Sequence, residues 1–347
     1  MTTRAVANID LGAIERNCRR LPKPLCAVVK ANAYGHGMVP VAEAALAGGA
    51  AWLAVATADE AAELRAAGIE ARLLVMGALT RDELRAAIDA DADVVAWTQD
   101  VADAAPRVHV KLDTGMGRLG TKDLELARRL AAHPHTVGLM THFATADERG
   151  DKFFRAQLDA FWEFADAVGS GDLIIHAANS AAALRDPASH LDMVRCGVAI
   201  YGLDPFQEDP DAHGLEPALS LRSWVASVRR LEPGESAGYG RRWRAEEPTW
   251  LATVPIGYGD GWRRALTNNA DVLVRGRRHP LAGAVSMDNV TVALGSETDV
   301  ELGDEVVLIG RQGDERILAE EVARRLGTIN YEVTTGLLPR VRREPVR

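Results

Sequence analysis

Near the start of the chain stands the stretch Val28-Val29-Lys30-Ala31-Asn32-Ala33-Tyr34-Gly35-His36-Gly37. The apolar run before its lysine, residues 25–29, predicts a buried strand, and the small residues and glycines after it predict a loop. Burial at such a junction lowers the pKa of a lysine from its ordinary value of about 10.4, because a low dielectric disfavours the charged form. The neutral amine of Lys30 would be a nucleophile for a carbonyl group, whereas a lysine that reaches solvent has no such role.

Outward from this stretch, short apolar segments alternate with Ala/Leu/Glu/Arg-rich segments of helical spacing. The predicted strands are residues 25–29, 52–56, 72–76, 93–97, 108–112, 137–141, 173–176 and 193–200. The predicted helices are residues 41–47, 59–67, 82–90, 122–132 and 151–168. Eight strands joined by helices favour an α/β fold, a (β/α)8 TIM-type barrel spanning residues 11–218, over an open doubly wound sheet. Residues 98–107 are too few for a full crossover helix.

The sequence pattern changes after about residue 218, where alternating apolar runs are punctuated by Gly, Pro and Asn. This pattern predicts a C-terminal, mostly-β domain over residues 219–347, with strands at residues 223–228, 250–254, 271–274, 290–294 and 305–309 and one helix at residues 319–326. Residues 5–10 also read as a strand, so we assign residues 1–10 to this second domain. Two domains agree with a length of 347 residues.

The composition argues against some binding partners and cellular compartments. A net charge of -9 argues against binding to nucleic acid or to an anionic membrane, because either surface would repel the chain. The first 17 residues lack the apolar core of a signal peptide, and no run of 18 apolar residues occurs, so we expect a cytoplasmic protein. Three cysteines without a CxxC pair suit a reducing compartment.

Polar residues gather at the predicted C-terminal ends of the barrel strands, where barrel enzymes place their catalytic groups. They are Lys30, Lys111 with Asp113, Arg118, His142, Asn179 with Ser180, and Arg195. Ser180 opens a predicted helix, so it is either an ordinary N-cap or part of a phosphate site with the backbone of Gly197 and Val198. We therefore predict the active site at this end of the barrel.

Residues 115–120 match the dinucleotide pattern GxGxxG and follow a strand. A Rossmann site also needs an acidic residue about 20 positions further on, at the tip of the next strand. That strand ends in Met140-Thr141-His142. We therefore set aside a nicotinamide or flavin site.

The stretch around Lys30 resembles the pyridoxal-phosphate attachment site of alanine racemases, and residues 111–120 resemble a second motif of that family. The resemblance runs from about residue 7 to residue 342. It implies pyridoxal 5'-phosphate on Lys30 and an Arg118 that binds the cofactor's phenolic oxygen and the substrate carboxylate, a fork geometry that lysine cannot copy. It also implies that Lys111 is carbamylated in some members; a plain ion pair between Lys111 and Asp113 stays the alternative.

The resemblance assigns further residues around the cofactor and the substrate. The implied cofactor-binding residues are Tyr34, Asn179, Ser180, Arg195, Gly197, Val198 and Tyr331. Met287 in Ser286-Met287-Asp288 would bind the substrate carboxylate through its backbone N–H. Tyr258, Asp288 and Arg264 would lie around the access route.

Arg195 would face the pyridine nitrogen, with His142 hydrogen-bonded behind it. Because an arginine cannot take the pyridine proton, the ring becomes a weaker electron sink, which favours quick reprotonation of Cα over transamination. Racemisation needs two bases on opposite faces of Cα. Lys30 is one, and by resemblance Tyr239 of the partner subunit in a homodimer is the other. A tyrosine of pKa near 10 acting at pH 7 needs its anion stabilised by about 4 kcal/mol, which a line through His142 and Arg195 would supply.

The sequence therefore predicts an alanine racemase that supplies D-alanine for peptidoglycan. Alternatives are a racemase of another small amino acid such as serine, and a non-catalytic pyridoxal-phosphate-binding barrel, which would need neither the β domain nor Tyr239. A metal hydrolase, in which a carbamylated barrel lysine bridges two metals, also needs a His-x-His on the first strand. Residues 25–29 contain no histidine, so no metal is predicted.

Overall fold

The chain divides into two compact units in a computed structural model that describes residues 4–169 and 171–347. One unit comprises Gly12–Glu216, and the other comprises the described residues up to Leu11 together with Pro217–Arg347. Each unit has its own sheets and its own core.

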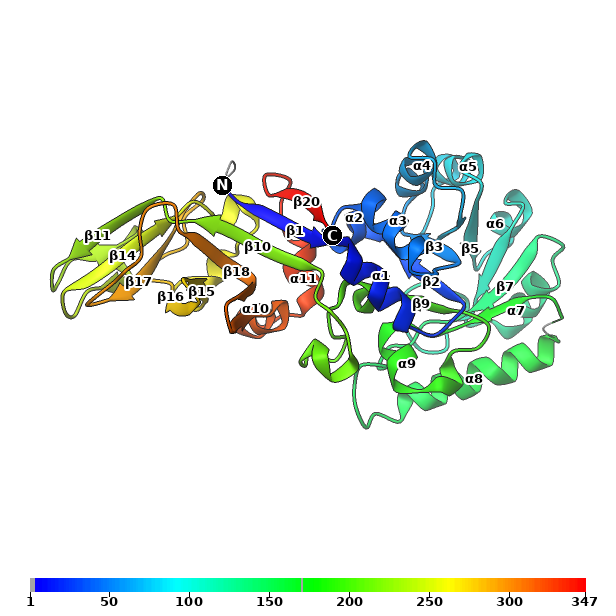
Figure 1. The fold of residues 1–347 in the computed structure, drawn as a ribbon. Coiled ribbons are helices and arrows are strands. Elements are labelled where there is room, and N and C mark those ends of the chain that lie inside the picture. The colour runs from blue at the N-terminus through cyan, green and yellow to red at the C-terminus, as the bar shows by residue number, and fades with distance from the viewer. Residues whose placement is uncertain (1–3, 170) are drawn as a thin grey trace. The chain divides into compact units, whose positions relative to one another are not determined.

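The first unit is a nearly closed parallel barrel of eight strands in the order β8-β7-β6-β5-β4-β3-β2-β9 (Figure 1). Its strands are β2 (Leu25–Val28), β3 (Trp52–Val55), β4 (Arg72–Val75), β5 (Ala92–Ala96), β6 (Val108–Lys111), β7 (Thr136–Met140), β8 (Ile174–His176) and β9 (Val194–Cys196). Main-chain bonds from Asp192 to Ile175 and from Arg195 to Ala178, both 2.9 Å, join the two ends of this sheet. The predicted TIM-type barrel is confirmed.

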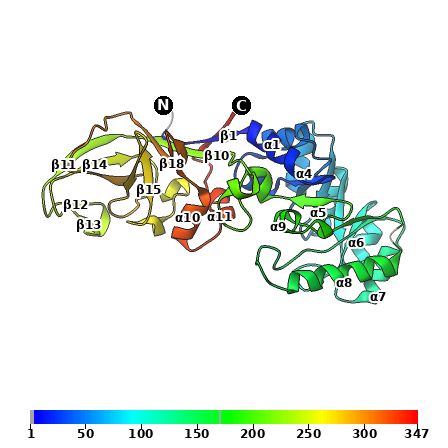
Figure 2. The same ribbon diagram turned by 60° about the horizontal axis from the view of Figure 1, so that its bottom comes forward.

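Helices cover the outside of the barrel strands (Figures 1 and 2). They are α1 (Leu11–Arg20), α3 (Met38–Ala47), α4 (Ala58–Ala66), α5 (Arg81–Asp89), α6 (Gln99–Ala104), α7 (Leu124–Ala131), α8 (Phe153–Val168) and α9 (Ser180–Arg185), with short 3-10 turns η1 (Pro187–Ser189), η2 (Val198–Tyr201) and η3 (Pro210–His213). The element labelled α2 (Lys30–Tyr34) is a left-handed turn that follows β2. Capping boxes start two of the helices, with Thr57 before α4 and Thr80 before α5. The short segment between β5 and β6 forms only the six-residue α6, as its length predicts.

The second unit is mostly β. Its strands are β1 (Val6–Asp10), β10 (Leu219–Trp224), β11 (Ser227–Leu231), β12 (Ser236–Ala237), β13 (Trp243–Arg244), β14 (Thr249–Val254), β15 (Asp271–Val274), β16 (Arg277–Pro280), β17 (Val290–Gly295), β18 (Glu305–Gln312), β19 (Glu315–Ile317) and β20 (Arg342–Val346). Its helical elements are η4 (Tyr239–Arg241), η5 (Tyr258–Asp260), η6 (Arg264–Leu266), α10 (Ala319–Leu326) and α11 (Asn330–Thr335). Strand β1 lies between β10 and β20, which confirms that the N-terminal strand pairs with the C-terminal region.

Two predicted elements are wrong in detail, and two helices were missed. Residues 193–200 are not one strand. Strand β9 ends at Cys196, because the next residue, Gly197, has a φ of -104° and a ψ of -88°, outside the strand region, and η2 follows. Residues 223–228 belong to two strands in different sheets: Val225 donates to Asp304, and Ala226 donates to Thr253. Helices α1 and α11 were not predicted; α11 is rich in β-branched residues, which have low helix propensity.

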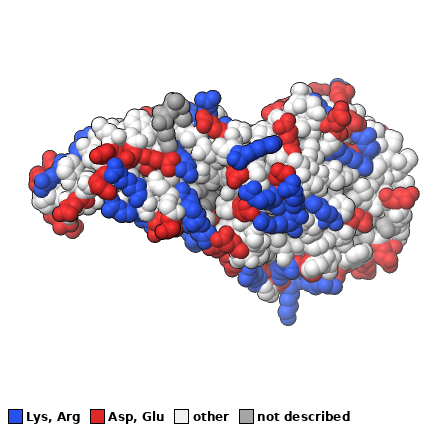
Figure 3. Space-filling view, in the orientation of Figure 1, with Lys and Arg blue, Asp and Glu red and all other residues white. Residues whose placement is uncertain are grey.

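Charged side chains of both signs are spread over the visible surface of the described residues (Figure 3). On the face shown in Figure 3, described basic and acidic side chains are interspersed over both units. None of the helices in the described ranges combines the length and apolarity that a membrane crossing needs.

Replacing Ile9 by alanine should lower the free energy of unfolding by about 2–5 kcal/mol, because it leaves a cavity in a fully buried position of β1. Urea unfolding followed by tryptophan fluorescence measures this. Asn8→Ala on the partly exposed face of the same strand is the control and should change the value by less than about 1 kcal/mol. Equal effects for the two variants would contradict the central placement of β1.

Candidate active site

Strand β2 places Lys30 at the C-terminal end of the barrel. All four strand residues are buried, and the Val29 N–H then donates to the Ala54 carbonyl at 2.9 Å. Lys30 itself is half-buried. Burial lowers the pKa of its ammonium, the Arg118 guanidinium lowers it further, and the Glu60 carboxylate opposes both effects. The amine is therefore closer to its nucleophilic form than an ordinary lysine.

The segment after Lys30 is a left-handed turn rather than the open loop that the sequence predicts. Residues 31–34 have φ values of 53°, 53°, 53° and 52°, and none of them is glycine. Each such residue costs roughly 1–2 kcal/mol. The Glu60 carboxylate accepts from the Ala31 N–H at 2.6 Å, and the Asn32 side chain accepts from the Met38 N–H at 2.9 Å. Surrounding contacts therefore hold a strained segment directly beside Lys30.

Tyr201 contacts both the end of β2 and the turn that follows Lys30. Its fully buried hydroxyl donates to the Val28 carbonyl at 2.7 Å, at the end of β2. Its ring stacks on His36 with centroids 4.5 Å apart and lies 5.0 Å from the ring of Tyr34. Burial raises the pKa of Tyr34 to about 12, so that hydroxyl keeps its proton at neutral pH and can act as a donor.

The predicted phosphate-binding residues of the barrel lie together. A Cβ on Gly197 would come within 2.5 Å of the Tyr34 hydroxyl oxygen, so any larger residue there would displace the Tyr34 ring. The Ser180 Oγ accepts from the N–H of Gly197 at 3.0 Å and from that of Ala199 at 3.3 Å. What Ser180 can still offer an anion is its hydroxyl hydrogen. Val198 follows Gly197 at the start of η2.

Asn179 is the N-cap of α9 and uses its side chain locally. Its Oδ1 accepts from the Ala182 N–H at 3.0 Å. The ordinary capping role therefore belongs to Asn179, and Ser180 is left to face Gly197.

Arg195 on β9 is 3% exposed and makes four hydrogen bonds. Its Nη2 donates to the carbonyls of Thr141 at 2.8 Å and Ala177 at 3.0 Å, and to His142 Nδ1 at 3.3 Å. Its Nη1 donates to His176 Nδ1 at 2.8 Å. Burial lowers the pKa of Arg195 to about 10, so it stays cationic at neutral pH. The predicted contact between Arg195 and His142 is present.

His142 is a neutral imidazole of one tautomer. Burial, followed by the positive charge of Arg195, lowers its pKa well below the ordinary range. Because a guanidinium can only donate, His142 Nδ1 must accept from Arg195, and the ring carries its proton on Nε2. That N–H is available to an acceptor in the site.

Lys111 ends β6 and is 5% exposed. Burial lowers its pKa to about 8, and the charges of Arg195 and Arg118 add to this. The Asp113 carboxylate turns into the following loop, where it accepts from the N–H groups of Gly115 and Gly117 at 3.0 Å. Its ion pair is with Lys122 at 3.9 Å. Asp113 thus shapes the loop that carries Arg118 instead of pairing with Lys111.

The remaining predicted residues belong to the β unit. Tyr239 begins η4 and is 74% exposed. The loop of Tyr258 lies against that of Met287: the Tyr258 N–H donates to Ser286 at 3.0 Å, and the Gly259 N–H donates to Met287 at 2.9 Å. Met287 is 52% exposed.

Asp288, Arg264 and Tyr331 are the other predicted site residues of this unit. Asp288 accepts from Arg340 at 2.7 Å. Arg264 begins η6, and Tyr331 lies in the first turn of α11.

Several site residues were not predicted as such from the sequence. They are Glu60, Tyr201 and the buried histidines His109 and His176. A histidine inside an apolar strand, such as His109 in β6, was the available signal, but a core role explains it equally well.

Two comparisons with known proteins agree with this arrangement of a barrel with a strand-end lysine followed by a β domain. Residues 9–205 match the family model described as the alanine racemase N-terminal domain, and residues 218–345 match that of the C-terminal domain. The chain belongs to the alanine racemase family.

Individual relatives cover nearly the whole chain. The alanine racemase of Symbiobacterium thermophilum is 43% identical over 97% of this chain and 96% of its own length, and that of Geobacillus stearothermophilus is 43% identical over 97% and 92%. The crystal structure of alanine racemase from E. faecalis has a TM-score of 0.93 at 39% identity, covering 99% of this chain and 98% of that one. The structure from Bacillus anthracis with bound L-Ala-P has a TM-score of 0.90 at 38% identity, covering 100% and 96%.

Lys111→Met should stabilise the protein most below about pH 8, where the native chain must bury a cation. The folded pKa of Lys111 lies below its unfolded value, so between about pH 8 and pH 10.5 the unfolded chain binds more protons and the native protein gains stability as pH rises. The advantage of the variant should therefore shrink across this window. Urea unfolding in carbon-dioxide-free buffer measures it.

Lys122→Met is the matched control, because Lys122 is 70% exposed and lies in the segment that follows β6. Its effect on the free energy of unfolding should not change across that window. A constant difference between the Lys111 variant and the native protein would show that Lys111 is not a desolvated lysine.

Proposed function

We propose that the chain is an alanine racemase that interconverts L-alanine and D-alanine with pyridoxal 5'-phosphate bound at Lys30. One observation carries the proposal: a lysine of lowered pKa just beyond β2 and a buried, cationic Arg195 on the adjacent strand β9 belong to one barrel, in a chain of the alanine racemase family. The D-alanine would supply peptidoglycan synthesis in the cytoplasm, where the three free, buried cysteines stay reduced.

The barrel residues fit the proposed cofactor. The Tyr34 hydroxyl, the Ser180 hydroxyl and the backbone around Gly197 would hold its phosphate in a cradle that a Cβ would fill. Val198 and Asn179 border the same place, and Tyr331 of the β unit would complete the set. The positive charges of Arg195, Lys111 and Arg118 favour an anionic ligand.

Bound there, pyridoxal phosphate supplies a carbonyl that condenses with an amino group and a conjugated ring that stabilises negative charge on Cα. Arg195 would face the ring nitrogen with N–H groups that cannot be given up at neutral pH. It would therefore disfavour protonation of that nitrogen and limit the electron-withdrawing power of the ring. This favours return of a proton to Cα, which is what a racemase requires.

Two bases would act on opposite faces of Cα. The Lys30 amine, whose pKa is lowered by burial, exchanges the proton on one face. The partner subunit's Tyr239 exchanges it on the other. The Nε2–H of His142 would donate to the phenolate oxygen of that tyrosine, because Nδ1 is occupied by Arg195.

Other residues would orient the substrate. Arg118 and the Met287 N–H would bind the carboxylate, and Tyr258, Asp288 and Arg264 would line the access route. Carbamylation of Lys111 belongs to this proposal, because its pKa of about 8 leaves part of the amine neutral and able to add to carbon dioxide with loss of a proton. The product is an anion that can bind Arg118.

A shared site in a homodimer is supported by the exposure of Tyr239 and Met287 on neighbouring loops of the β unit. A general base needs a site from which water is excluded. Tyr239 and Met287 are 74% and 52% exposed in the single chain, and a second copy that covered them would exclude water from both. Closed two-fold dimers bring the same pair of surfaces together twice, so each dimer would have two sites.

Lys30→Ala should lose the visible absorption of the bound cofactor and lower turnover by more than about a thousandfold, because the attachment point and one base are both removed. Exchange of the Cα hydrogen of L- and D-alanine with deuterated water separates the roles further. Tyr239→Phe should keep this exchange for one enantiomer and lose it for the other. Lys152→Ala, an exposed lysine at the start of α8, is the control.

Equal exchange of both enantiomers by Tyr239→Phe would contradict the two-base proposal. A native level of racemisation by Lys30→Ala would contradict the assignment as a whole. A non-catalytic pyridoxal-phosphate-binding barrel would keep the absorption band and exchange neither enantiomer in the native protein. A serine racemase would show a larger kcat/KM for serine than for alanine.

Mixing the two inactive variants tests the shared site. A heterodimer of Lys30→Ala and Tyr239→Phe has one site with an intact lysine and an intact partner tyrosine, so random reassociation should restore about one quarter of native activity. Activity is measured after unfolding and refolding the mixture, with each variant alone refolded as the control. Sites built within single chains would regain nothing.

A further inference from the structure

A chain of buried hydrogen bonds crosses the barrel from Arg195 on β9 to Asp93 on β5. The Arg195 Nη1 lies 2.8 Å from His176 Nδ1, and His176 Nε2 lies 2.8 Å from His109 Nδ1. His109 Nε2 then lies 3.1 Å from Asp93 Oδ2. The two histidines and Asp93 are 0% exposed. No predicted role of the site uses His109 or Asp93.

The backbone makes room for the middle of this chain. The register between β6 and β7 shifts at Val108/His109, so that His109 lies opposite Gly138. A Cβ on Gly138 would come within 2.4 Å of His109 Nδ1, the atom that contacts His176. The rings of Trp52 and His109 pack nearly perpendicular to one another, with centroids 5.6 Å apart. The imidazole is therefore held in one orientation.

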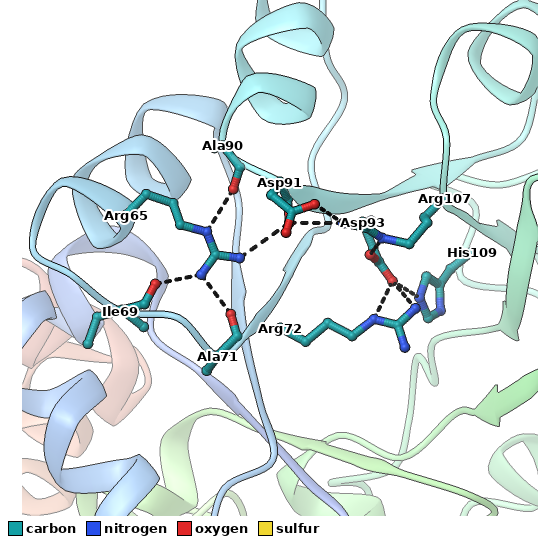
Figure 4. Close-up of polar contacts among 9 residues, drawn as sticks. All are labelled: Arg65, Ile69, Ala71, Arg72, Ala90, Asp91, Asp93, Arg107 and His109. Atoms are coloured by element: carbon teal, nitrogen blue, oxygen red, sulfur yellow. Dashed lines mark hydrogen bonds and ion pairs between the residues drawn. The ribbon is translucent and has the colours of Figure 1, made fainter.

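Asp93 is an ionised carboxylate at the far end (Figure 4). Its Oδ2 accepts from Arg72 at 2.8 Å as well as from His109, and its Oδ1 accepts from Arg107 at 2.6 Å. Burial alone would raise the pKa of Asp93, but the hydrogen bonds from His109 and Arg107 lower it below the ordinary value. Arg72 in turn lies over the Trp52 ring at 4.1 Å.

The two ends of the chain determine where each proton lies. A guanidinium can only donate and an ionised carboxylate can only accept. Burial lowers the pKa of both histidines, so each ring carries a single proton at neutral pH. His176 must therefore accept at Nδ1 and donate from Nε2, and His109 must do the same. Every hydrogen bond in the chain then points from Arg195 toward Asp93.

We infer that Asp93 and His109 are positioning residues that act on Arg195 through His176. By accepting from His176, the pair fixes the proton of that ring on Nε2 and leaves Nδ1 as a permanent acceptor for the guanidinium. Its effect on turnover rests on the proposed function, in which Arg195 faces the cofactor nitrogen. The direction of the hydrogen bonds does not depend on the proposed function.

Loss of the acceptor at position 93 would reverse the direction of the hydrogen bond between His109 and His176. Arg72, which lies against Asp93, would then present its N–H groups to His109 Nε2, so the proton of His109 would move to Nδ1. His176 would face two donors, one on each side, and Arg195 would lose one of its four hydrogen bonds. The guanidinium would be less well held, while Arg118 and Met287 would still bind substrate. The loss should therefore fall on kcat and not on KM.

Nitrogen NMR of the native holoenzyme, labelled at histidine, reads the tautomers directly. His109→Leu and His176→Leu spectra assign the two rings. The inference expects both rings to be neutral near pH 7 with the proton on Nε2. A proton on Nδ1 of either ring, or a doubly protonated ring, would overturn it. This result does not depend on whether the chain racemises alanine.

Three variants test the effect on turnover. Asp93→Leu offers no acceptor and should lower kcat at least about tenfold with KM within about twofold. Asp93→Asn keeps one carbonyl oxygen that can accept from His109, so kcat should return to within about threefold of native. Asp91→Asn is the matched control, because Asp91 also accepts from Arg107 but lies outside the chain; kcat and KM should be native.

The melting temperature of each variant is measured to show whether it is folded. Native kcat in a folded Asp93→Leu protein, or equal losses for Asp93→Leu and Asp93→Asn, would overturn the inference. If Asp93→Leu fails to fold, the tautomers of the native protein still decide it. If the native protein has no racemase activity, the proposed function fails, and the tautomers again stand as a separate result.

Discussion

The cost of burying several positive charges at one end of a barrel governs this site. Arg195 and Lys111 are almost fully buried and Lys30 is half-buried. Burial lowers the pKa of each, the charges of Arg195, Arg118 and Lys30 lower that of Lys111 further, and the charge of Arg118 lowers that of Lys30 further. Each residue meets this cost differently. The lowered pKa values bring the two lysines closer to the neutral amine, whereas Arg195 stays cationic and donates to four acceptors. A ligand with phosphate and carboxylate groups would relieve the remaining repulsion, so the same constraint selects an anionic ligand.

The position of the Lys30 side chain depends on a strained backbone at residues 31–34. Residues 31–34 adopt the left-handed conformation directly after Lys30, and Glu60 and Tyr201 contribute hydrogen bonds that hold both ends of the junction. An unstrained loop would leave the lysine side chain free to sample solvent. The fixed turn keeps it at the end of β2, within the influence of Arg118.

Much of the fold could be predicted from the sequence, because eight short apolar runs alternated with helical spacing along the first two thirds of the chain. The position of Lys30 at a strand end followed from the same pattern. Local patterns do not reveal a change of sheet, however. The chain passes from β10 to β11 at residues 225–226 because those two residues donate to different neighbouring segments, and both segments lie far away in the sequence.

The buried polar chain was beyond sequence reasoning for a related reason. His109 lies among apolar residues of β6, where a histidine reads as part of the core. Its meeting with His176 and Asp93 depends on the registers of separate strands and on the shift at Val108/His109. The left-handed turn is a similar case, since non-glycine residues disfavour that conformation and only the surrounding contacts impose it.

The most direct test of the account is to find the amine that carries the cofactor. The protein is loaded with pyridoxal phosphate, reduced with borohydride and digested, and the modified peptide is sequenced by mass spectrometry. The account predicts one stable pyridoxyl group per chain, on Lys30. Modification of Lys111 or of any other lysine in place of Lys30, or no modification after reduction, would contradict it.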